Sequence, residues 1–80
     1  MAAIGKSTRL DSVAMARFAA RLERYLADSG TSKSALCLMA GISRPSLYNV
    51  LSANPGTKVK ILERICDAMG VELSDMVKRG

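Results

Sequence analysis

The sequence predicts an all-α fold, a single compact domain of five helices, and three observations lead to this prediction. Apolar residues recur at helical spacing in successive stretches, and no stretch alternates apolar and polar residues as a half-buried strand does. The chain has 80 residues, of which 49% are hydrophobic, and only three are aromatic. Its core must therefore consist of Leu, Ile, Val, Met and Ala, which favours helices over a sandwich of strands.

We expect a flexible arm at residues 1 to 9, followed by a helical domain at residues 10 to 80. The first helix of this domain is expected from about Asp11 to Asp28. One face of this helix is apolar, with Met15, Phe18, Leu22, Tyr25 and Leu26. The other face carries Arg17, Arg21 and Arg24. We expect these arginines to form a solvated surface with an ion pair to Glu23 or Asp28. Ser29 and Gly30 end the helix.

Residues 32 to 51 predict two short helices joined at Gly41. The first, about 33 to 40, has an apolar face at i, i+1 and i+4, made of Ala35, Leu36 and Met39. Gly41 suits the left-handed conformation that closes a helix, Ile42 can insert between the two helices, and Ser43 is a natural N-cap.

The second helix of this pair, about 44 to 52, buries one side and leaves a polar side outward. Its buried side has the spacing i, i+3 and i+4, with Leu47, Val50 and Leu51. Turned outward or to the flank are Arg44, Pro45, Tyr48 and Asn49. This layout is typical of a helix-turn-helix, in which the second helix enters the major groove of DNA.

Two more helices are expected after a loop that contains Asn54, Pro55 and Gly56. Thr57 can cap the fourth helix, which runs to about Met69 and is stopped by Gly70. Its apolar stripe consists of Ile61, Leu62, Ile65, Cys66 and Met69. A short fifth helix, about Leu73 to Lys78, carries too many apolar groups for a free tail. We interpret these as part core and part dimer interface: Leu73, Met76 and Val77.

The charge and composition of the chain narrow the class of function. The net charge of +5 favours a polyanionic partner, although small soluble domains often carry this charge, so it is informative only beside the helix pair. No run approaches the roughly 18 apolar residues needed to span a bilayer, and no charged-then-apolar leader opens the chain. A cytoplasmic location is therefore expected.

Catalysis, metal binding and a cofactor have little support in the residues. The chain contains no histidine and no Cys-x-x-Cys pair, its carboxylates are few and scattered, and no serine has a recognisable base partner. Cys37 and Cys66 lie on apolar helix faces and are interpreted as small hydrophobic residues. A disulfide or redox switch between them is the less favoured alternative, because intracellular thiols stay reduced.

From about Ser32 to Met76 the chain resembles the lambda-repressor-like family of phage repressors and Cro proteins. The residues that carry the resemblance are Leu36, Cys37, Gly41, Ile42, Ser43, Leu47, Val50, Met69, Gly70, Val71, Leu73 and Met76. The sequence departs from the family's pattern at Lys33, Cys37, Leu51 and Ala53, where glutamine, alanine, glutamate and glycine are usual. The changes at Leu51 and Ala53 leave open whether the following loop keeps the family's path.

The second helix of the pair holds the candidate base-reading residues. Arg44 has the planar fork that fits O6 and N7 of guanine, and Asn49 can read adenine. The resemblance implies base contacts at Arg44, Pro45 and Asn49, with Pro45 against a thymine methyl group. Tyr48 is a further candidate for a base contact, and the alternative is that its ring packs on the first helix of the pair.

Candidate phosphate-binding residues gather at helix starts and in the adjoining loop, where N–H groups and helix dipoles favour anions. They are Ser32, Lys33, Ser43, Ser46, Asn54, Lys58 and Lys60. Simpler roles compete with this one. Ser32, Ser43 and Thr57 are also natural helix caps, and Lys58 and Lys60 are equally suited to be solvated surface charges.

Together these patterns predict a sequence-specific regulator that binds double-stranded DNA. We expect a homodimer on a palindromic operator, because one small module makes few base contacts. The resemblance implies a repressor, of phage or mobile-element type, and the residues themselves do not exclude an activator. The rival hypothesis is a protein-interaction module, such as an antitoxin or adaptor, that uses the same helical domain.

Overall fold

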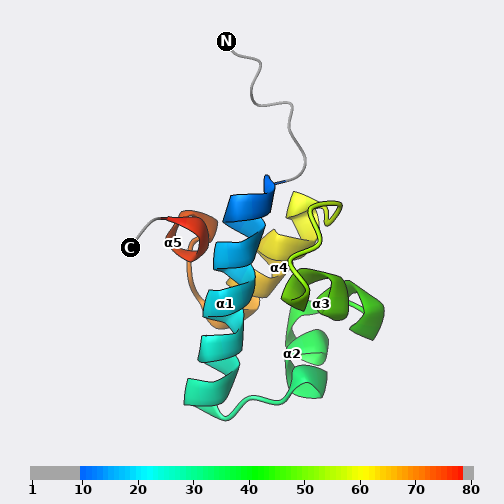
Figure 1. The fold of residues 1–80 in the computed structure, drawn as a ribbon. Coiled ribbons are helices and arrows are strands. Elements are labelled where there is room, and N and C mark those ends of the chain that lie inside the picture. The colour runs from blue at the N-terminus through cyan, green and yellow to red at the C-terminus, as the bar shows by residue number, and fades with distance from the viewer. Residues whose placement is uncertain (1–9, 79–80) are drawn as a thin grey trace.

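The computed structural model describes residues 10 to 78 and shows five helices there (Figure 1). In chain order they are α1 (Ser12–Ser29), α2 (Lys33–Ala40), α3 (Arg44–Leu51), α4 (Val59–Met69) and α5 (Leu73–Val77). Within these residues there is no strand, so the all-α prediction is confirmed and each helix begins and ends within two residues of its expected bounds. The arm predicted at residues 1 to 9 lies outside the described residues.

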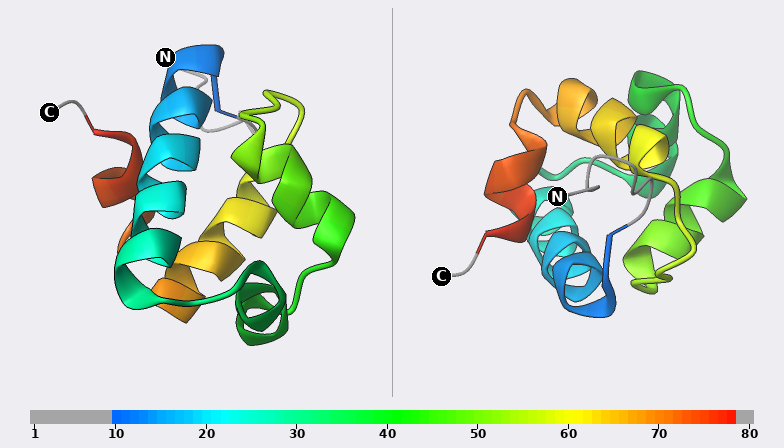
Figure 2. Two further views of the ribbon diagram at one scale, coloured as in Figure 1. Left: turned by 60° about the horizontal axis from the view of Figure 1, so that its bottom comes forward. Right: turned by 90° about the horizontal axis from the view of Figure 1, so that it is seen from above.

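The helices enclose one core. α1 packs against α3 and α5, while α2 packs against α3 and α4, as the two views in Figure 2 also show. The fully buried side chains come from four helices: Met15, Phe18, Leu22, Leu36, Leu47, Val50, Leu62 and Ile65. These residues confirm the apolar faces predicted for α1, α3 and α4. α5 adds Met76, which is 5% exposed.

The buried face of α2 differs from the prediction by about one residue. Leu36, Cys37 and Ala40 are buried, whereas Met39 is 54% exposed and its neighbour Leu38 is exposed even more. The i, i+1, i+4 spacing is correct, but it starts at Leu36 and not at Ala35. Because α2 lies against both α3 and α4, small side chains such as Cys37 and Ala40 fit in this contact while the long Met39 stays outside.

The helix ends depend on local hydrogen bonds. The side chains of Asp11, Ser32 and Ser43 cap α1, α2 and α3 by accepting the N–H of the residue three positions later. Gly41 closes α2 in the left-handed conformation, with φ of 68°, as its sequence position predicts. The turn between α2 and α3 is therefore fixed at its two ends by Gly41 and Ser43, the residues from which it was predicted.

Thr57 does not cap α4, contrary to the prediction. The N-cap position of α4 is Lys58, whose side chain makes no capping hydrogen bond. The preceding loop is tightened by Asn54, whose side chain accepts the N–H of Gly56 at 2.8 Å and whose carbonyl accepts the N–H of Thr57 at 3.1 Å. Thr57 is thereby turned inward, 7% exposed, and its hydroxyl has no hydrogen-bond partner.

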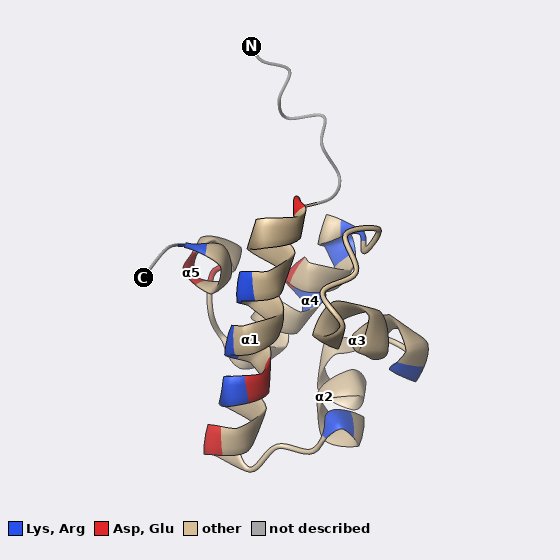
Figure 3. Cartoon of the chain, viewed as in Figure 1, with Lys and Arg blue, Asp and Glu red and all other residues tan. Residues whose placement is uncertain are grey.

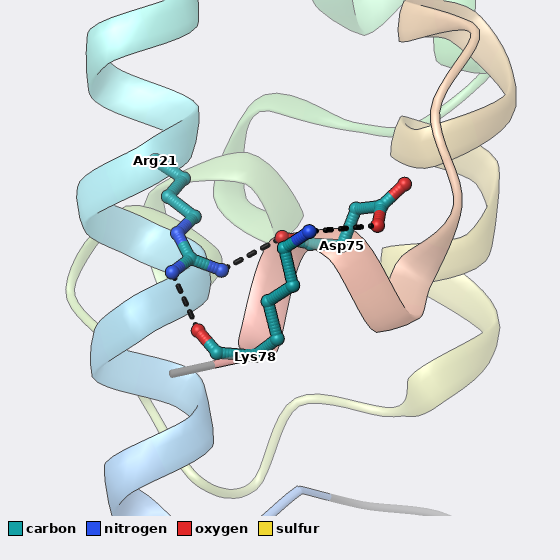
Figure 4. A network of polar contacts seen from close by, with 3 residues as sticks. All are labelled: Arg21, Asp75 and Lys78. Carbon is teal, nitrogen blue, oxygen red and sulfur yellow. Dashed lines mark hydrogen bonds and ion pairs between the residues drawn. The ribbon is translucent and has the colours of Figure 1, made fainter. Parts of the chain in front are cut away.

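The arginines of α1 do more than form a solvated surface. Figure 3 shows basic residues along the side of α1 that faces α5. Arg17 and Arg21 are half-buried, and they donate to backbone carbonyls of the last turn of α5, including Arg21 to Asp75 at 2.7 Å (Figure 4). Only Arg24 forms the predicted kind of ion pair, with Asp28 at 4.0 Å. Cationic donors at a helix C-terminus satisfy its unpaired carbonyls, so two of these arginines hold α5 in place.

α5 therefore uses part of its apolar surface within the chain. Met76 belongs to the core, because α5 packs on α1, and this side chain is not available to a second copy. Leu73 and Val77 are half-buried against the same core and keep exposed surface. The expected division of this helix into core and interface thus leaves Leu73 and Val77 as the interface candidates.

Both cysteines are free and buried, as small hydrophobic residues would be. Burial, together with the nearby carboxylates of Asp67 and Glu63, raises the pKa of the Cys66 thiol to about 11. At neutral pH this group is a protonated, unreactive thiol.

The loop after α3 contains a left-handed residue that is an alanine and not a glycine. Ala53 has φ of 58°, its N–H donates to the carbonyl of Val50 at 3.0 Å, and the N–H of Asn54 donates to the carbonyl of Asn49 at 3.0 Å. These are the two bonds of a Schellman ending, in which the left-handed position is usually glycine. Ala53 is therefore strained in a helix ending that would suit glycine.

We expect Ala53→Gly to stabilise the protein by about 0.5 to 1 kcal/mol, because an alanine in the left-handed region is strained and glycine is not. Ala20→Gly, on the exposed side of α1, makes the same chemical change inside a helix and should destabilise by about 1 kcal/mol. Urea unfolding of the two variants checks both signs. Destabilisation by Ala53→Gly would contradict the strain inferred at this residue.

Candidate nucleic-acid interface

The surface formed by α2, α3 and the loop to α4 carries no carboxylate. No Asp or Glu occurs between Asp28 and Glu63, whereas four cations do: Lys33, Arg44, Lys58 and Lys60. Figure 3 shows basic residues and no acidic residue on α2 and α3. A surface with charge of only one sign attracts the opposite charge and repels its own, so this part of the chain suits an anionic partner.

The outer face of α3 brings the four predicted base-reading residues together. Leu47 and Val50 anchor the helix in the core, and they leave the opposite side exposed. On that side lie Arg44, Pro45, Tyr48 and Asn49. This helix is thus held by one face and offers hydrogen-bonding, cationic and apolar groups on the other, as a helix must to enter a groove.

Two contacts join the outer face of α3 to α2. Arg44 donates a hydrogen bond to the hydroxyl of Ser34, and the ammonium of Lys33 lies 5.9 Å from the centre of the Tyr48 ring. Tyr48 is 52% exposed, so its ring lies beside the first helix of the pair and still has accessible surface. Sequence reasoning missed Ser34, because nothing in its spacing indicates that Arg44 reaches across to it.

The starts of α2 and α3 carry exposed hydroxyls among the predicted phosphate-binding residues. Ser32 accepts the N–H of Ala35 at 3.0 Å, and Ser43 accepts the N–H of Ser46 at 3.3 Å. The hydroxyl of Ser43 also lies 3.0 Å from that of Ser46. The capping role proposed for Ser32 and Ser43 is confirmed, and Lys33 begins α2 directly after the first of these caps.

A hollow of about 260 Å³ lies where α3 meets the start of α4. It is lined by Ser46, Asn49, Gly56, Thr57, Lys58 and Ile61. Thr57 brings a buried hydroxyl without a partner, and α4 begins there without a side-chain cap, so first-turn N–H groups lack a side-chain acceptor. Lys58 lies at the same place, whereas Asn54 is used within the loop and Lys60 is exposed on α4.

The turn between α2 and α3 is held from α4. Arg64 donates from Nη1 to the carbonyl oxygen of Gly41 at 3.2 Å. The N–H of Ile42 donates to the carbonyl of Cys37 at 3.1 Å, and Ile42 is half-buried against the core. The role of Arg64 was not predicted, because it depends on two segments 23 residues apart in the chain.

The acidic residues lie elsewhere. A second hollow, of about 340 Å³, is lined by residues of α4, α5 and the segment between them, and it contains three carboxylates, Glu63, Asp67 and Glu72. This surface would repel a polyanion. Among residues 10 to 78 no set of three or more Cys, Asp or Glu residues is arranged to hold a metal ion. None of the helices described has the length and apolar character needed to cross a membrane.

Comparison with known proteins agrees with this geometry. A family model described as the Cro/C1-type HTH DNA-binding domain matches residues 21–79, from the middle of α1 to beyond α5. The comparison with curated proteins gave no match, and neither did the comparison with solved structures. The resemblance noted in the sequence is thus confirmed over most of the chain, which belongs to the Cro/C1-type helix-turn-helix family of sequence-specific DNA-binding regulators.

Proposed function

We propose that the chain is a repressor that acts in the cytoplasm as a homodimer on a palindromic operator, of phage or mobile-element type. The observation that carries the proposal is the outer face of α3, which is exposed, free of carboxylates and anchored from behind by Leu47 and Val50. In helix-turn-helix proteins the second helix of the pair, here α3, lies in the major groove. The DNA-binding domain of this proposal is the one expected at residues 10 to 80.

Arg44 and Asn49 are the proposed base readers. Arg44 has five N–H donors, so the hydrogen bond to Ser34 leaves others for O6 and N7 of a guanine. Asn49 lies at the side of the hollow beside α4 and can pair with an adenine edge. Pro45 offers an apolar surface to a thymine methyl group, and Tyr48 adds its ring edge or hydroxyl.

Phosphates are proposed to lie on both sides of α3. On one side are Ser32 and Lys33 at the start of α2, and Ser43 and Ser46 at the start of α3 itself. On the other side is the hollow at the start of α4, where the first-turn N–H groups without a side-chain cap and the ammonium of Lys58 suit an anion, with Asn54 and Lys60 nearby in sequence.

Lys58→Ala is expected to weaken binding to all duplexes alike and to lower the slope of log K against log salt by about 1 for each copy bound. Arg24→Ala, a loss of the same charge at an exposed site on α1, should leave this slope unchanged. Binding isotherms at several salt concentrations measure both. An unchanged slope for Lys58→Ala would exclude a phosphate contact at this residue.

We propose a dimer because a single copy would contact only a few base pairs. Two copies related by a twofold axis would place their α3 helices about 34 Å apart, on successive turns of one face of the duplex. We propose that Leu73 and Val77 provide the apolar part of the contact, because both keep exposed surface at the edge of the core.

Selection of bound duplexes from a random pool, followed by sizing of the complex, tests this function. We expect an inverted repeat occupied by two copies. Enrichment of no sequence, together with retention of a protein partner, would favour the rival role as an interaction module. A single copy on an asymmetric site would contradict the homodimer.

A further inference from the structure

Among the residues described, the guanidinium of Arg64 forms a hydrogen bond to a backbone carbonyl and not an ion pair with a nearby carboxylate. Arg64 is exposed on α4 and its chain neighbours include the carboxylates of Glu63 and Asp67, yet within residues 10 to 78 it forms no ion pair. Instead it donates to the carbonyl oxygen of Gly41, at the turn between α2 and α3. A cation placed at the C-terminal end of a helix is also favoured by the helix dipole.

The carbonyl of Gly41 matters because of what the turn controls. α3 is anchored in the core by Leu47 and Val50, which lie in its middle and last turns, whereas its first turn carries the exposed Arg44 and Pro45. That first turn is only three residues from Gly41. A small rotation of the peptide at Gly41 therefore moves the start of α3, and with it the side chain of Arg44.

We propose that Arg64 is a positioning residue for DNA recognition, which holds the turn between α2 and α3 so that Arg44 meets its base in one orientation. This inference rests on the proposed function, since it concerns the same outer face of α3. It assigns to α4, which contributes none of the proposed base contacts, a share in sequence discrimination.

The experiment compares Arg64→Gln with Arg24→Gln, which removes the same charge from an exposed site on α1. Each protein is titrated with the duplex selected from the random pool and with a scrambled duplex of equal length, at several salt concentrations. We expect Arg64→Gln to weaken binding to the selected duplex about fivefold to tenfold, as loss of an exposed hydrogen bond of ordinary strength would, and to weaken binding to the scrambled duplex no more than Arg24→Gln does. Arg64→Lys, which keeps a charged donor, should recover part of this loss.

A readout on the free protein separates positioning of the turn from a direct contact with DNA and from a loss of folding. In amide NMR spectra, Arg64→Gln should shift the signals of residues 41 to 44 while the dispersion of the spectrum and the core signals stay the same. If Arg64→Gln has the same ratio of selected to scrambled affinity as Arg24→Gln, the positioning role is wrong and the proposed function is unaffected. A salt slope lower by about 1 for each copy bound than that of Arg24→Gln would overturn it as well, because it marks a direct phosphate contact. If the unaltered chain prefers no duplex at all, the proposed function fails, and the positioning role fails with it.

Discussion

Arg44→Ala is expected to remove most of the preference of the protein for its operator while the fold stays intact. A good bidentate contact to guanine discriminates by about 1 to 3 kcal/mol, and a dimer loses one such contact in each half-site. We therefore expect binding to the selected duplex to weaken roughly 30-fold or more, while binding to a scrambled duplex falls only by the loss of one charge per copy. Titration of both duplexes at a fixed salt concentration measures the difference.

Two controls make this result specific. Arg44→Lys keeps the charge but loses the planar fork, so it should lose discrimination at one base position and retain non-specific binding. Because Arg44 is exposed and its partner Ser34 is exposed as well, the free energy of unfolding should change by no more than about 0.5 kcal/mol. Equal weakening on the selected and the scrambled duplex would contradict base reading by Arg44 and leave it only a phosphate contact.

Phe18→Ala is expected to destabilise the protein by about 3 to 5 kcal/mol, the largest loss of stability from a single side chain. Phe18 is fully buried and is the largest side chain in the core, so its removal leaves a cavity between α1 and the helices packed on it. A domain of this size has a thin core and a total stability near the lower end of about 5 to 15 kcal/mol. The variant should therefore be largely unfolded at 37 °C.

Val13→Ala is the matched control for Phe18→Ala. Val13 lies on the same helix and is 57% exposed, so its truncation should change the free energy of unfolding by less than about 0.5 kcal/mol. Urea unfolding followed by circular dichroism measures both variants. If Phe18→Ala were no less stable than Val13→Ala, the packing of α1 against the core would be wrong.

The parts of the fold that follow from local spacing could be predicted from the sequence. The apolar stripes of α1, α3 and α4 repeat every three or four residues, and Ser43 and Gly41 have the local chemistry of an N-cap and a left-handed helix ending. The exposed face of α3 follows from the same periodicity, because Leu47 and Val50 fix which side is buried. Placing Arg44 and Asn49 on one accessible surface needed nothing more.

The rest depends on contacts between distant segments. The buried face of α2 was misplaced because Met39 is more hydrophobic than Ala40, and only the close approach of α3 and α4 favours the smaller side chain. The docking of Arg17 and Arg21 on α5 and the bond from Arg64 to Gly41 join segments more than 20 residues apart. Spacing within one helix carries no information about such bonds.

Thr57 shows a different limit of sequence reasoning. A threonine just before an apolar stripe is a reasonable N-cap, and the neighbouring residue takes that position only because Asn54 tightens the preceding loop. The error has a functional consequence. Because α4 is left without a side-chain cap, its start becomes the strongest candidate for a phosphate outside α2 and α3.

The central claim, that the outer face of α3 lies against base edges, is tested most directly by intermolecular NOEs in the complex with the selected duplex. With the protein isotopically labelled, we expect NOEs from the side chains of Arg44, Pro45 and Asn49 to major-groove base protons, including a thymine methyl group at Pro45. NOEs confined to α1 or α5, with none from α3, would contradict the claim.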